Sequence, residues 1–337
     1  MYVGTRYRLL QLIAWTRGET LFLTGIAIVP ALLINRLGWT WLTVPWVPVA
    51  MLGTASAFTV GFRNNATYGR MWEARQIWGG IVNATRAWGI GVRDLILPAP
   101  HRDAAETLAL HRRLLHSHIA WLTALRYQLR EARPWETANR RDNAAFRARF
   151  FTVPEHDGQL DARLLALLGA EEATALAGRP NRAAALLATQ SAALAALAAD
   201  GTLEPNRHVA LYARLAELLD LQGRCERIKN FPYPRQFATL NYWFIRLFVV
   251  LVPFGMVQEF RRVDGTWVWM SIPLSVLVTW MFLALEKVGE STENPFEGAS
   301  NDVPVSQLSR MLEIELRALT GERELPAPLG AQNDIIV

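Results

Sequence analysis

The sequence has very little cysteine and lysine, and each scarcity narrows the class of protein. Cys225 is the single cysteine, so no disulfide can form within the chain. Only Lys229 and Lys287 are lysines, so arginine supplies almost all of the positive charge. With an isoelectric point of about 9.7, nucleic acid is one partner to consider. The distribution of charge along the chain explains the excess better, and we expect no nucleic-acid partner.

The sequence also lacks the residue patterns of a catalytic site. No glycine-rich phosphate loop, Ser/His/Asp set or paired-carboxylate site stands out, which argues against an enzyme. Four histidines gather in one region, at His101, His111, His116 and His118. Their spacing fits no common set of zinc ligands. We therefore predict no catalytic residue, no metal site and no cofactor.

Charge is missing from three apolar stretches, and a fourth contains a single charged residue. The candidate membrane spans are residues 21–34, 39–62, 237–257 and 267–285. The first is short for a span, whereas the second and fourth hold no charged residue and are long enough to cross a bilayer. The third span contains one charge, Arg246. A charge within a span is costly, so Arg246 is either a functional residue or extends toward the membrane surface.

Most of the arginine lies between the second and third spans, where periodic apolar residues indicate several helices. Strand patterns are nearly absent, so we predict an all-α membrane protein with four transmembrane helices. The positive-inside rule places both termini and the large middle region in the cytoplasm. The predicted parts are an N-terminal segment with the first two membrane helices (1–62), a cytosolic helical region (63–236), two further membrane helices (237–290) and a cytosolic C-terminal segment (291–337).

An apolar stripe precedes the end of the second span. Thr54, Phe58 and Phe62 recur at i, i+4 and i+8, on one face of a helix and over about 12 Å of its length. Such a stripe is commonly packed or exposed to lipid. The alternative is a hydrophobic constriction, because several copies of this helix around one axis would form a narrow apolar throat that gates by dewetting.

The stretch GFRNNATYGRMWEARQIW (61–78) then changes abruptly from apolar to polar. Arg63, Asn64 and Asn65 follow the stripe directly. They are candidates for a polar vestibule in which an ion regains its hydration after an apolar throat. The asparagines are equally suited to cap a helix that begins near Gly69.

A second polar segment, ENPFEGASND (293–302), follows the fourth span. Glu293, Glu297 and Asp302 offer oxygen ligands for a cation, although the proline and glycine also suit an ordinary turn.

Together these features resemble the bestrophin family of ion channels, in its bacterial branch. The resemblance rests on GFRNNATYGRMWEARQIWGGIVNATRAW (61–88), on GRCERIKNFPYP (223–234) and on ENPF (293–296), in the order and spacing of the family. It covers the alanine-rich segment 161–200 poorly. The resemblance implies a homopentamer around one central pore, with four membrane helices and a large helical cytosolic region in each subunit. It also implies a place in the bacterial inner membrane.

The resemblance assigns roles to several residues. It places the apolar neck of the pore at Thr54, Phe58 and Phe62, the stripe that helical spacing selects independently. The family usually has an aliphatic residue at the first of these positions, so Thr54 implies a wetter ring. A second constriction at the cytosolic exit falls on Asn206, where a polar residue should relax any filter. The acidic run by which animal bestrophins bind calcium is missing from residues 297–302, so we do not expect calcium activation of that kind.

The sequence thus predicts a channel that passes small monovalent ions passively. Anions, chloride above all, are favoured because aromatic ring edges are electropositive and the cytosolic region is rich in arginine. A sodium-selective channel of the same fold is one alternative. A membrane carrier or a non-conducting scaffold is another, although a carrier often contains internal repeats and none is evident here.

Overall fold

The computed structural model describes residues 1–7, 9–98, 102–263 and 265–337. Over these residues the chain forms α-helices and short 3-10 helices, and its only β pairing consists of isolated bridges. The prediction of an all-α fold is confirmed. The α-helices are α1 (Leu9–Asn35), α2 (Trp46–Leu95), α3 (Ala104–Arg130), α4 (Arg141–Phe150), α5 (Leu160–Leu168), α6 (Ala170–Leu176), α7 (Arg182–Ala199), α8 (Pro205–Asn230), α9 (Arg235–Val263), α10 (Ser271–Glu293) and α11 (Val305–Leu319). The 3-10 helices are η1 (Thr40–Leu42), η2 (Pro154–Asp157) and η3 (Gly265–Met270).

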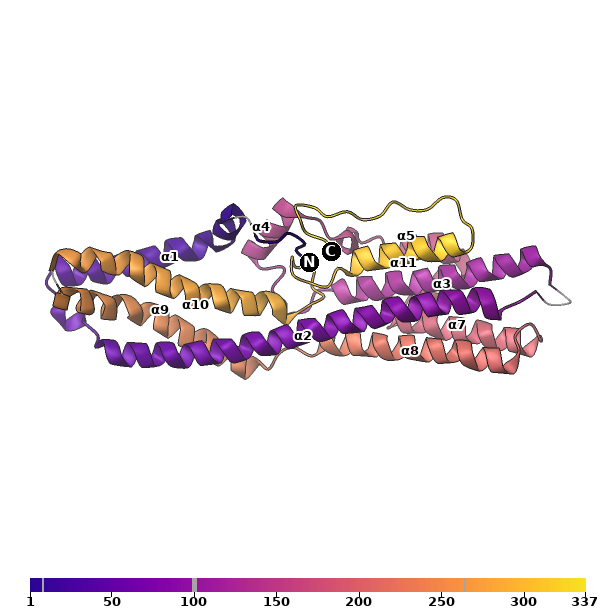
Figure 1. Ribbon diagram of the computed structural model, residues 1–337, viewed down its shortest axis with the longest axis horizontal. Coiled ribbons are helices and arrows are strands. Elements are labelled where there is room, and N and C mark those ends of the chain that lie inside the picture. Colours follow the sequence, from indigo (N-terminus) through magenta and orange to yellow (C-terminus); the bar gives the residue numbers. More distant parts are fainter. Residues whose placement is uncertain (8, 99–101, 264) are drawn as a thin grey trace.

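Helix α2 runs along most of the length of the molecule (Figure 1). It contains 50 residues, and at 1.5 Å per residue it is about 75 Å long. Pro48 lies in its first turn, where a missing N–H costs nothing, and no proline follows before Pro98. The predicted new helix near Gly69 is therefore wrong, because α2 continues without a break through residues 63–69.

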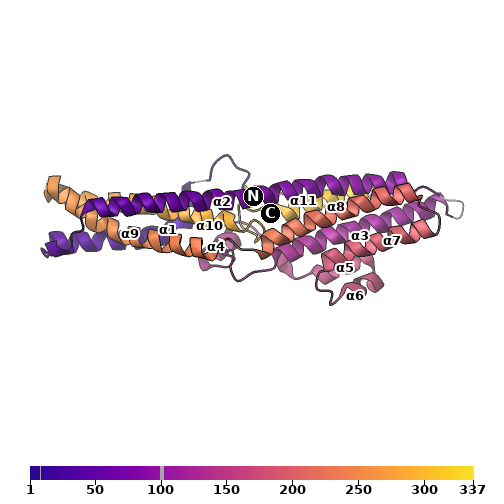
Figure 2. The same ribbon diagram turned by 90° about the horizontal axis from the view of Figure 1, so that it is seen from below.

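The elements divide into two halves along the long axis (Figures 1 and 2). We call α1, residues 46–62 of α2, α9 and α10 the membrane half. The helices α1, α2, α9 and α10 are all long and apolar enough to cross a membrane. Their mutual contacts bury only small groups of side chains, such as Leu23, Val60, Ile245 and Val249. Large apolar side chains cover the outside, and Phe22 is 57% exposed, which suits a surface that faces lipid rather than water.

Helix α7 also meets the length and hydropathy of a membrane span. However, it packs between α3 and α8, far from the membrane half (Figures 1 and 2). Its leucines Leu186, Leu194 and Leu197 are buried in the interior formed with those helices. We therefore assign α7 to the other half of the molecule.

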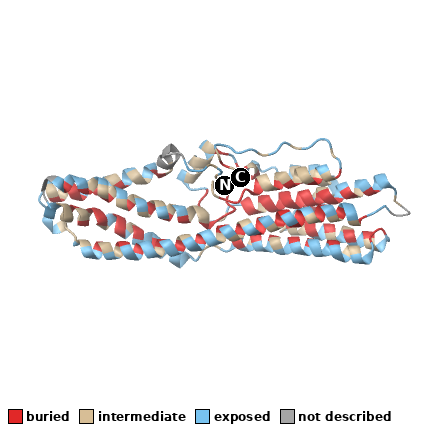
Figure 3. Cartoon of the chain, in the orientation of Figure 1, coloured by how far each residue is buried: buried red, intermediate tan, exposed pale blue. Residues whose placement is uncertain are grey.

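We call residues 63–95 of α2 together with α3, α5–α8 and α11 the bundle half. It holds one large continuous apolar core, which includes the fully buried indoles of Trp78, Trp88 and Trp121. Figure 3 shows buried residues along the inner faces of these helices and exposed residues outside. Helix α3 begins with a capping box, in which Asp103 and Glu106 bond each other's backbone N–H.

The two halves meet at α4 and the loops 131–140 and 294–304. The two ends of the chain also come together there, since Tyr2 forms an antiparallel bridge with Ile335 (Figure 1). The junction is thus built from segments that are far apart in the sequence.

Candidate pore-lining helix

The predicted apolar stripe lies on an exposed face of α2 in the single subunit. Phe58 is 64% exposed and Phe62 is 73% exposed, and Thr54 is exposed on the same face. The Thr54 hydroxyl donates to the Ala50 carbonyl oxygen at 3.0 Å, so its hydrogen satisfies the backbone of its own helix. The three side chains therefore have no packing role within the subunit.

The opposite face of α2 is fixed to α9 and α10. Ser56, Val60 and Arg63 are buried along this face. Gly53 also lies there, and a Cβ atom at this position would lie 2.6 Å from the Phe248 ring of α9, so only glycine permits the close approach. One face of the helix thus holds its position while the other remains free.

Arg63 is buried, in contrast to the exposed vestibule residue that the sequence suggests. Its side chain is 5% exposed, and Nη2 lies 2.9 Å from Oε2 of Glu293 at the end of α10. Arg235, at the start of α9, contacts the other oxygen of the same carboxylate at 2.5 Å. This ion triad joins α2, α9 and α10 immediately below the stripe.

Arg70 adds a second connection two turns further along α2. Its Nε donates to the Glu293 carbonyl oxygen at 3.1 Å, and its Nη2 donates to the carbonyls of Ile228 and Phe231, each at 2.9 Å. The end of α8 and the end of α10 are thereby fixed to α2. This role of Arg70 was not predicted from the sequence. The change from apolar to polar residues after Phe62 was the only indication of it.

The two asparagines differ in their surroundings. Asn64 donates from Nδ2 to the Leu285 carbonyl oxygen at 3.0 Å and is partly buried. Asn65 is exposed. It lies seven residues, close to two helical turns, after Phe58 and therefore continues the exposed stripe. Neither asparagine caps a helix, because both lie within α2.

Asn206 lies in the first turn of α8, and its side chain is exposed. Helix α8 begins at the end of the bundle half remote from the membrane half, where Arg207 contacts the Leu95 carbonyl oxygen at the end of α2. The stripe and Asn206 thus lie toward opposite ends of the molecule.

Arg246 lies within the membrane half and is paired. Its Nη1 lies 2.7 Å from Oε2 of Glu286 on α10, and its guanidinium carbon lies 4.4 Å from the centre of the Tyr242 ring. The ion pair with Glu286 explains how α9 holds the charge of Arg246 within the membrane half.

The acidic residues from Glu293 to Asp302 contact other parts of the chain. Glu293 belongs to the ion triad, Glu297 accepts hydrogen bonds from Thr137 and Ala138, and Asp302 accepts from Arg130 at 3.3 Å.

The described histidines have different partners from one another. His111 contacts the Ile96 carbonyl, His116 contacts Glu322 and His118 contacts Gln190. His101 lies outside the described residues. Within the described part of the chain, no group of three or more His, Cys, Asp or Glu side chains is arranged to hold a metal ion.

Four long apolar helices, one of them extended into a helical bundle, define a polytopic membrane protein. The family described as Bacterial/Fungal Bestrophin protein matches residues 9–318, and the chain belongs to this family. The resemblance stated from the sequence is confirmed.

The relatives and solved structures agree with this assignment. The voltage-dependent anion channel-forming protein RSc3414 of Ralstonia nicotianae is 30% identical over 86% of this chain and 82% of its own length. The voltage-dependent anion channel-forming protein YneE of Escherichia coli K12 is 27% identical over 84% of this chain and 79% of its own length. The crystal structure of a bacterial bestrophin homolog from Klebsiella pneumoniae is 26% identical, covers 90% of this chain and 98% of its own, and gives a TM-score of 0.73. The family is one of membrane ion channels and not of enzymes.

Proposed function

We propose that the protein is a homopentameric channel that passes small monovalent ions passively, with anions such as chloride favoured. The exposed stripe on α2 carries the proposal, because its aromatic side chains have no partner within the subunit while the opposite face of the helix is fixed. Five copies of α2 around one axis place these side chains against the pore. Relatives of this chain are named as anion channel-forming proteins, which supports the preference for anions.

In this channel Thr54, Phe58 and Phe62 form the neck. An ion loses hydration energy in an apolar constriction, so the neck limits conduction. The electropositive edges of the aromatic rings favour an anion over a cation at this point. The Thr54 hydroxyl is already bonded to the helix backbone, yet its oxygen makes this ring less apolar than an aliphatic side chain would.

Asn65 begins the wider vestibule beyond the neck, and Asn206 lines the second aperture where α8 begins. Arg63 lies at the level of the vestibule and acts there through its buried pairing with Glu293. The protein lies in the inner membrane, with both termini and the bundle half in the cytoplasm, as the distribution of arginine favours.

Phe58→Ala and Phe62→Ala should each raise single-channel conductance or open probability, because truncation widens the neck and admits water. Planar-bilayer recordings of the purified oligomer measure both quantities. Phe22→Ala is a matched control, since Phe22 is an exposed phenylalanine of the membrane half that lies on α1. Unchanged currents from both folded neck variants would refute the neck assignment. Absence of current steps from the folded wild-type protein would favour a carrier or a scaffold.

The sign of the permeant ion is tested by the reversal potential in asymmetric NaCl. A potential close to that of chloride is expected. A potential close to that of sodium would replace the anion preference by a sodium-selective channel of the same fold.

Asn64→Ala and Asn65→Ala separate anchorage from conduction. Asn64→Ala should lower thermal stability, because it removes the donor to the Leu285 carbonyl oxygen. Asn65→Ala should change conductance with little change in stability, because its side chain is exposed. The reverse pattern would remove Asn65 from the vestibule.

A further inference from the structure

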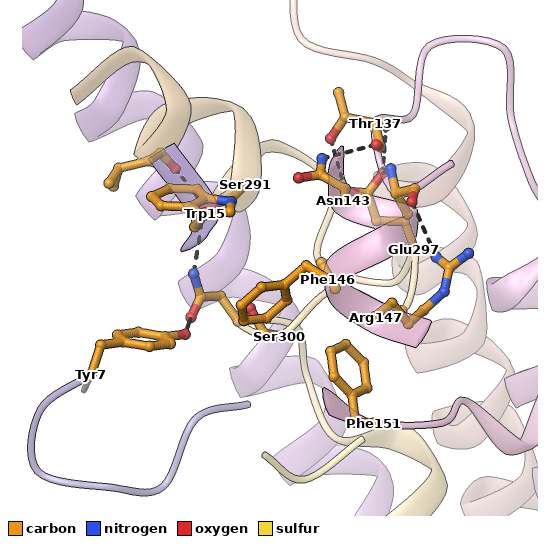
Figure 4. Close-up of a pocket in the computed structure, with 15 residues that line it drawn as sticks. Tyr7, Trp15, Thr137, Asn143, Phe146, Arg147, Phe151, Ser291, Glu297 and Ser300 are labelled. Carbon is orange, nitrogen blue, oxygen red and sulfur yellow. Dashed lines mark hydrogen bonds between the residues drawn. The ribbon is translucent and has the colours of Figure 1, made fainter. Parts of the chain in front are cut away.

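A cavity of about 190 Å³ lies at the junction of the two halves (Figure 4). It is far larger than the ~10–15 Å³ that a single water molecule requires. Its walls come from the N-terminal segment, the start of α1, the loop 131–140 together with α4, the end of α10 and the loop that follows α10. The Tyr7 hydroxyl donates to Asn301 Oδ1 at 2.9 Å and so joins the N-terminal segment to that loop.

The wall of this cavity contains a buried carboxyl group with unusual surroundings. The described part of the chain has five buried aspartate and glutamate residues. Four of them form ion pairs, namely Glu155 with Arg126, Glu286 with Arg246, Glu293 with Arg63 and Asp302 with Arg130. Glu297 is the fifth, and no ion pair to it is found among the described residues.

The donors to Glu297 are neutral. The backbone N–H groups of Thr137 and Ala138 donate to Oε2 at 2.8 and 3.3 Å, and the Thr137 hydroxyl donates to Oε1 at 3.2 Å. These bonds hold the carboxyl group in place without neutralising it. A buried carboxylate of this kind is costly, so the group either holds a proton or is joined by a positive charge.

Aromatic side chains form much of the remaining wall. Tyr7, Trp15, Phe146 and Phe151 line the cavity, and in Figure 4 the ring of Phe146 lies between Tyr7 and Glu297. Aromatic faces attract cations that have lost their hydration shell, and organic ammonium ions are the ligands that such groups of rings commonly hold.

We propose that this cavity is a binding site for a small organic ammonium ion, whose nitrogen donates to Glu297 and whose carbon atoms pack against Phe146 and its aromatic neighbours. The site is separate from the pore residues and does not rest on the proposed channel function.

A hydrated divalent metal ion suits the cavity less well. Calcium takes six to eight oxygen ligands, commonly with several carboxylates. Glu297 is the one carboxylate on the wall of this cavity. The Asp302 carboxylate instead accepts hydrogen bonds from Arg130 and from the backbone N–H groups of Gly298 and Ala299.

Protons are expected to leave Glu297 when the ammonium ion binds. Burial and the nearby Asp302 raise the pKa of Glu297, so the free carboxyl group holds a proton more readily than an exposed one. A bound cation favours the ionised form, so affinity should rise with pH. The charged groups that act on Glu297 from the surrounding elements are Asp302, Glu136, Arg147 and Lys229.

Two of these groups already have other partners. Lys229 forms an ion pair with Glu136. Arg147 donates to the Ala138 carbonyl oxygen at 3.2 Å and to Asn139 Oδ1 at 3.1 Å, and burial lowers its pKa. Neither cation therefore takes the place of the proposed ligand at Glu297.

The test is isothermal titration of the full-length protein in detergent with n-butylammonium chloride, n-butanol and calcium chloride. We expect binding of n-butylammonium, with net proton release at pH 7 when buffers of different ionisation enthalpy are compared. The neutral n-butanol should bind at least about tenfold more weakly. Equal affinity for the amine and the alcohol, or binding of calcium alone, would overturn the proposal.

Two variants and one control locate the site. Glu297→Gln should weaken n-butylammonium binding at least about tenfold and abolish proton release, because it removes the negative charge. Phe146→Leu should weaken binding about three- to fivefold by removing an aromatic face. Glu172→Gln is the matched control, since Glu172 lines a different hollow and pairs with Arg113.

Thermal unfolding and elution volume must match the wild type in each variant. Should Glu297→Gln fail to fold, Phe146→Leu and the comparison of amine with alcohol still decide the question. Unchanged affinity in both folded variants would place any ammonium binding elsewhere.

Discussion

The membrane half and the bundle half use the same kinds of side chain in opposite ways. In the bundle half, Trp78, Trp88 and Trp121 are fully buried in one continuous core. In the membrane half, Trp243 is 62% exposed and Leu277 is 51% exposed, and the buried groups are small and separate. The reason is the solvent, because apolar side chains gain little by leaving lipid but much by leaving water.

The junction between the halves follows neither pattern. Its interior contains buried ions, such as Arg63 with Glu293 and Arg130 with Asp302. Buried pairs of this kind add little net stability, but each partner becomes very costly when the other is removed. The junction is thus specified by polar geometry, whereas the bundle half depends on apolar volume.

The largest difference in the free energy of unfolding is expected when a tryptophan is replaced by alanine in each half. Trp121→Ala removes a fully buried indole and should cost about 3–5 kcal/mol of the free energy of unfolding. It also leaves Gln222 without the indole N–H donor, now at 2.8 Å. Trp243→Ala, at a side chain of α9 that is 62% exposed, should cost less than about 1 kcal/mol. Denaturant unfolding in detergent measures both losses of free energy. Similar losses would contradict the conclusion that tryptophan burial stabilises the bundle half more than the membrane half.

The next largest effect is expected at the junction. Glu293→Gln leaves Arg63 buried without a negative partner and should cost about 3 kcal/mol or more. Glu217→Gln disrupts the exposed pair with Arg214 on α8 and should cost no more than about 1 kcal/mol. The difference in melting temperature between these two isosteric changes is the measurement. A small effect of Glu293→Gln would show that water reaches the triad.

A smaller effect, which depends on pH, is expected from His118 in the core of the bundle half. Its Nδ1 and Nε2 lie 3.1 Å from Gln190 Oε1 and from the Thr85 hydroxyl, and burial lowers its pKa from 6.5 to about 3. The unfolded chain therefore binds a proton that the folded core excludes. Stability should fall by about 1.4 kcal/mol for each pH unit between 6.5 and 3.

His118→Gln supplies the control for this pH dependence. The variant should lose less stability than the wild type between pH 7 and pH 5, by about 2 kcal/mol. Unfolding curves at these two values measure the difference. If the stability of the two proteins changed equally with pH, the buried His118 would not be the cause of the pH dependence.

Several elements could be predicted from the sequence because they depend on local pattern. The charge-free stretches predict the spans, and the i, i+4 and i+8 spacing of Thr54, Phe58 and Phe62 predicts a shared helix face. The structure places that face on the outside of the subunit. The alanine-rich segment contains α7, which meets the length and hydropathy of a membrane span but packs between α3 and α8.

The roles of the polar residues after the stripe could not be predicted in this way. The sequence suggested a helix break near Gly69 and a solvent-exposed Arg63, whereas α2 is continuous and Arg63 is buried. The partners Glu293, Ile228 and Phe231 lie far along the chain, so no local pattern contains them. The same is true of the cavity at Glu297, whose walls come from five separate segments.

By itself the sequence determined what depends on periodicity and on transfer from water, namely helices, spans and the exposed aromatic stripe. Only the tertiary structure decided which charges are paired, that α2 is one helix and that Glu297 alone among the described buried carboxylates lacks an ion pair. The physical reason is that hydropathy acts residue by residue, whereas the cost of a buried charge depends on which distant group the fold places beside it.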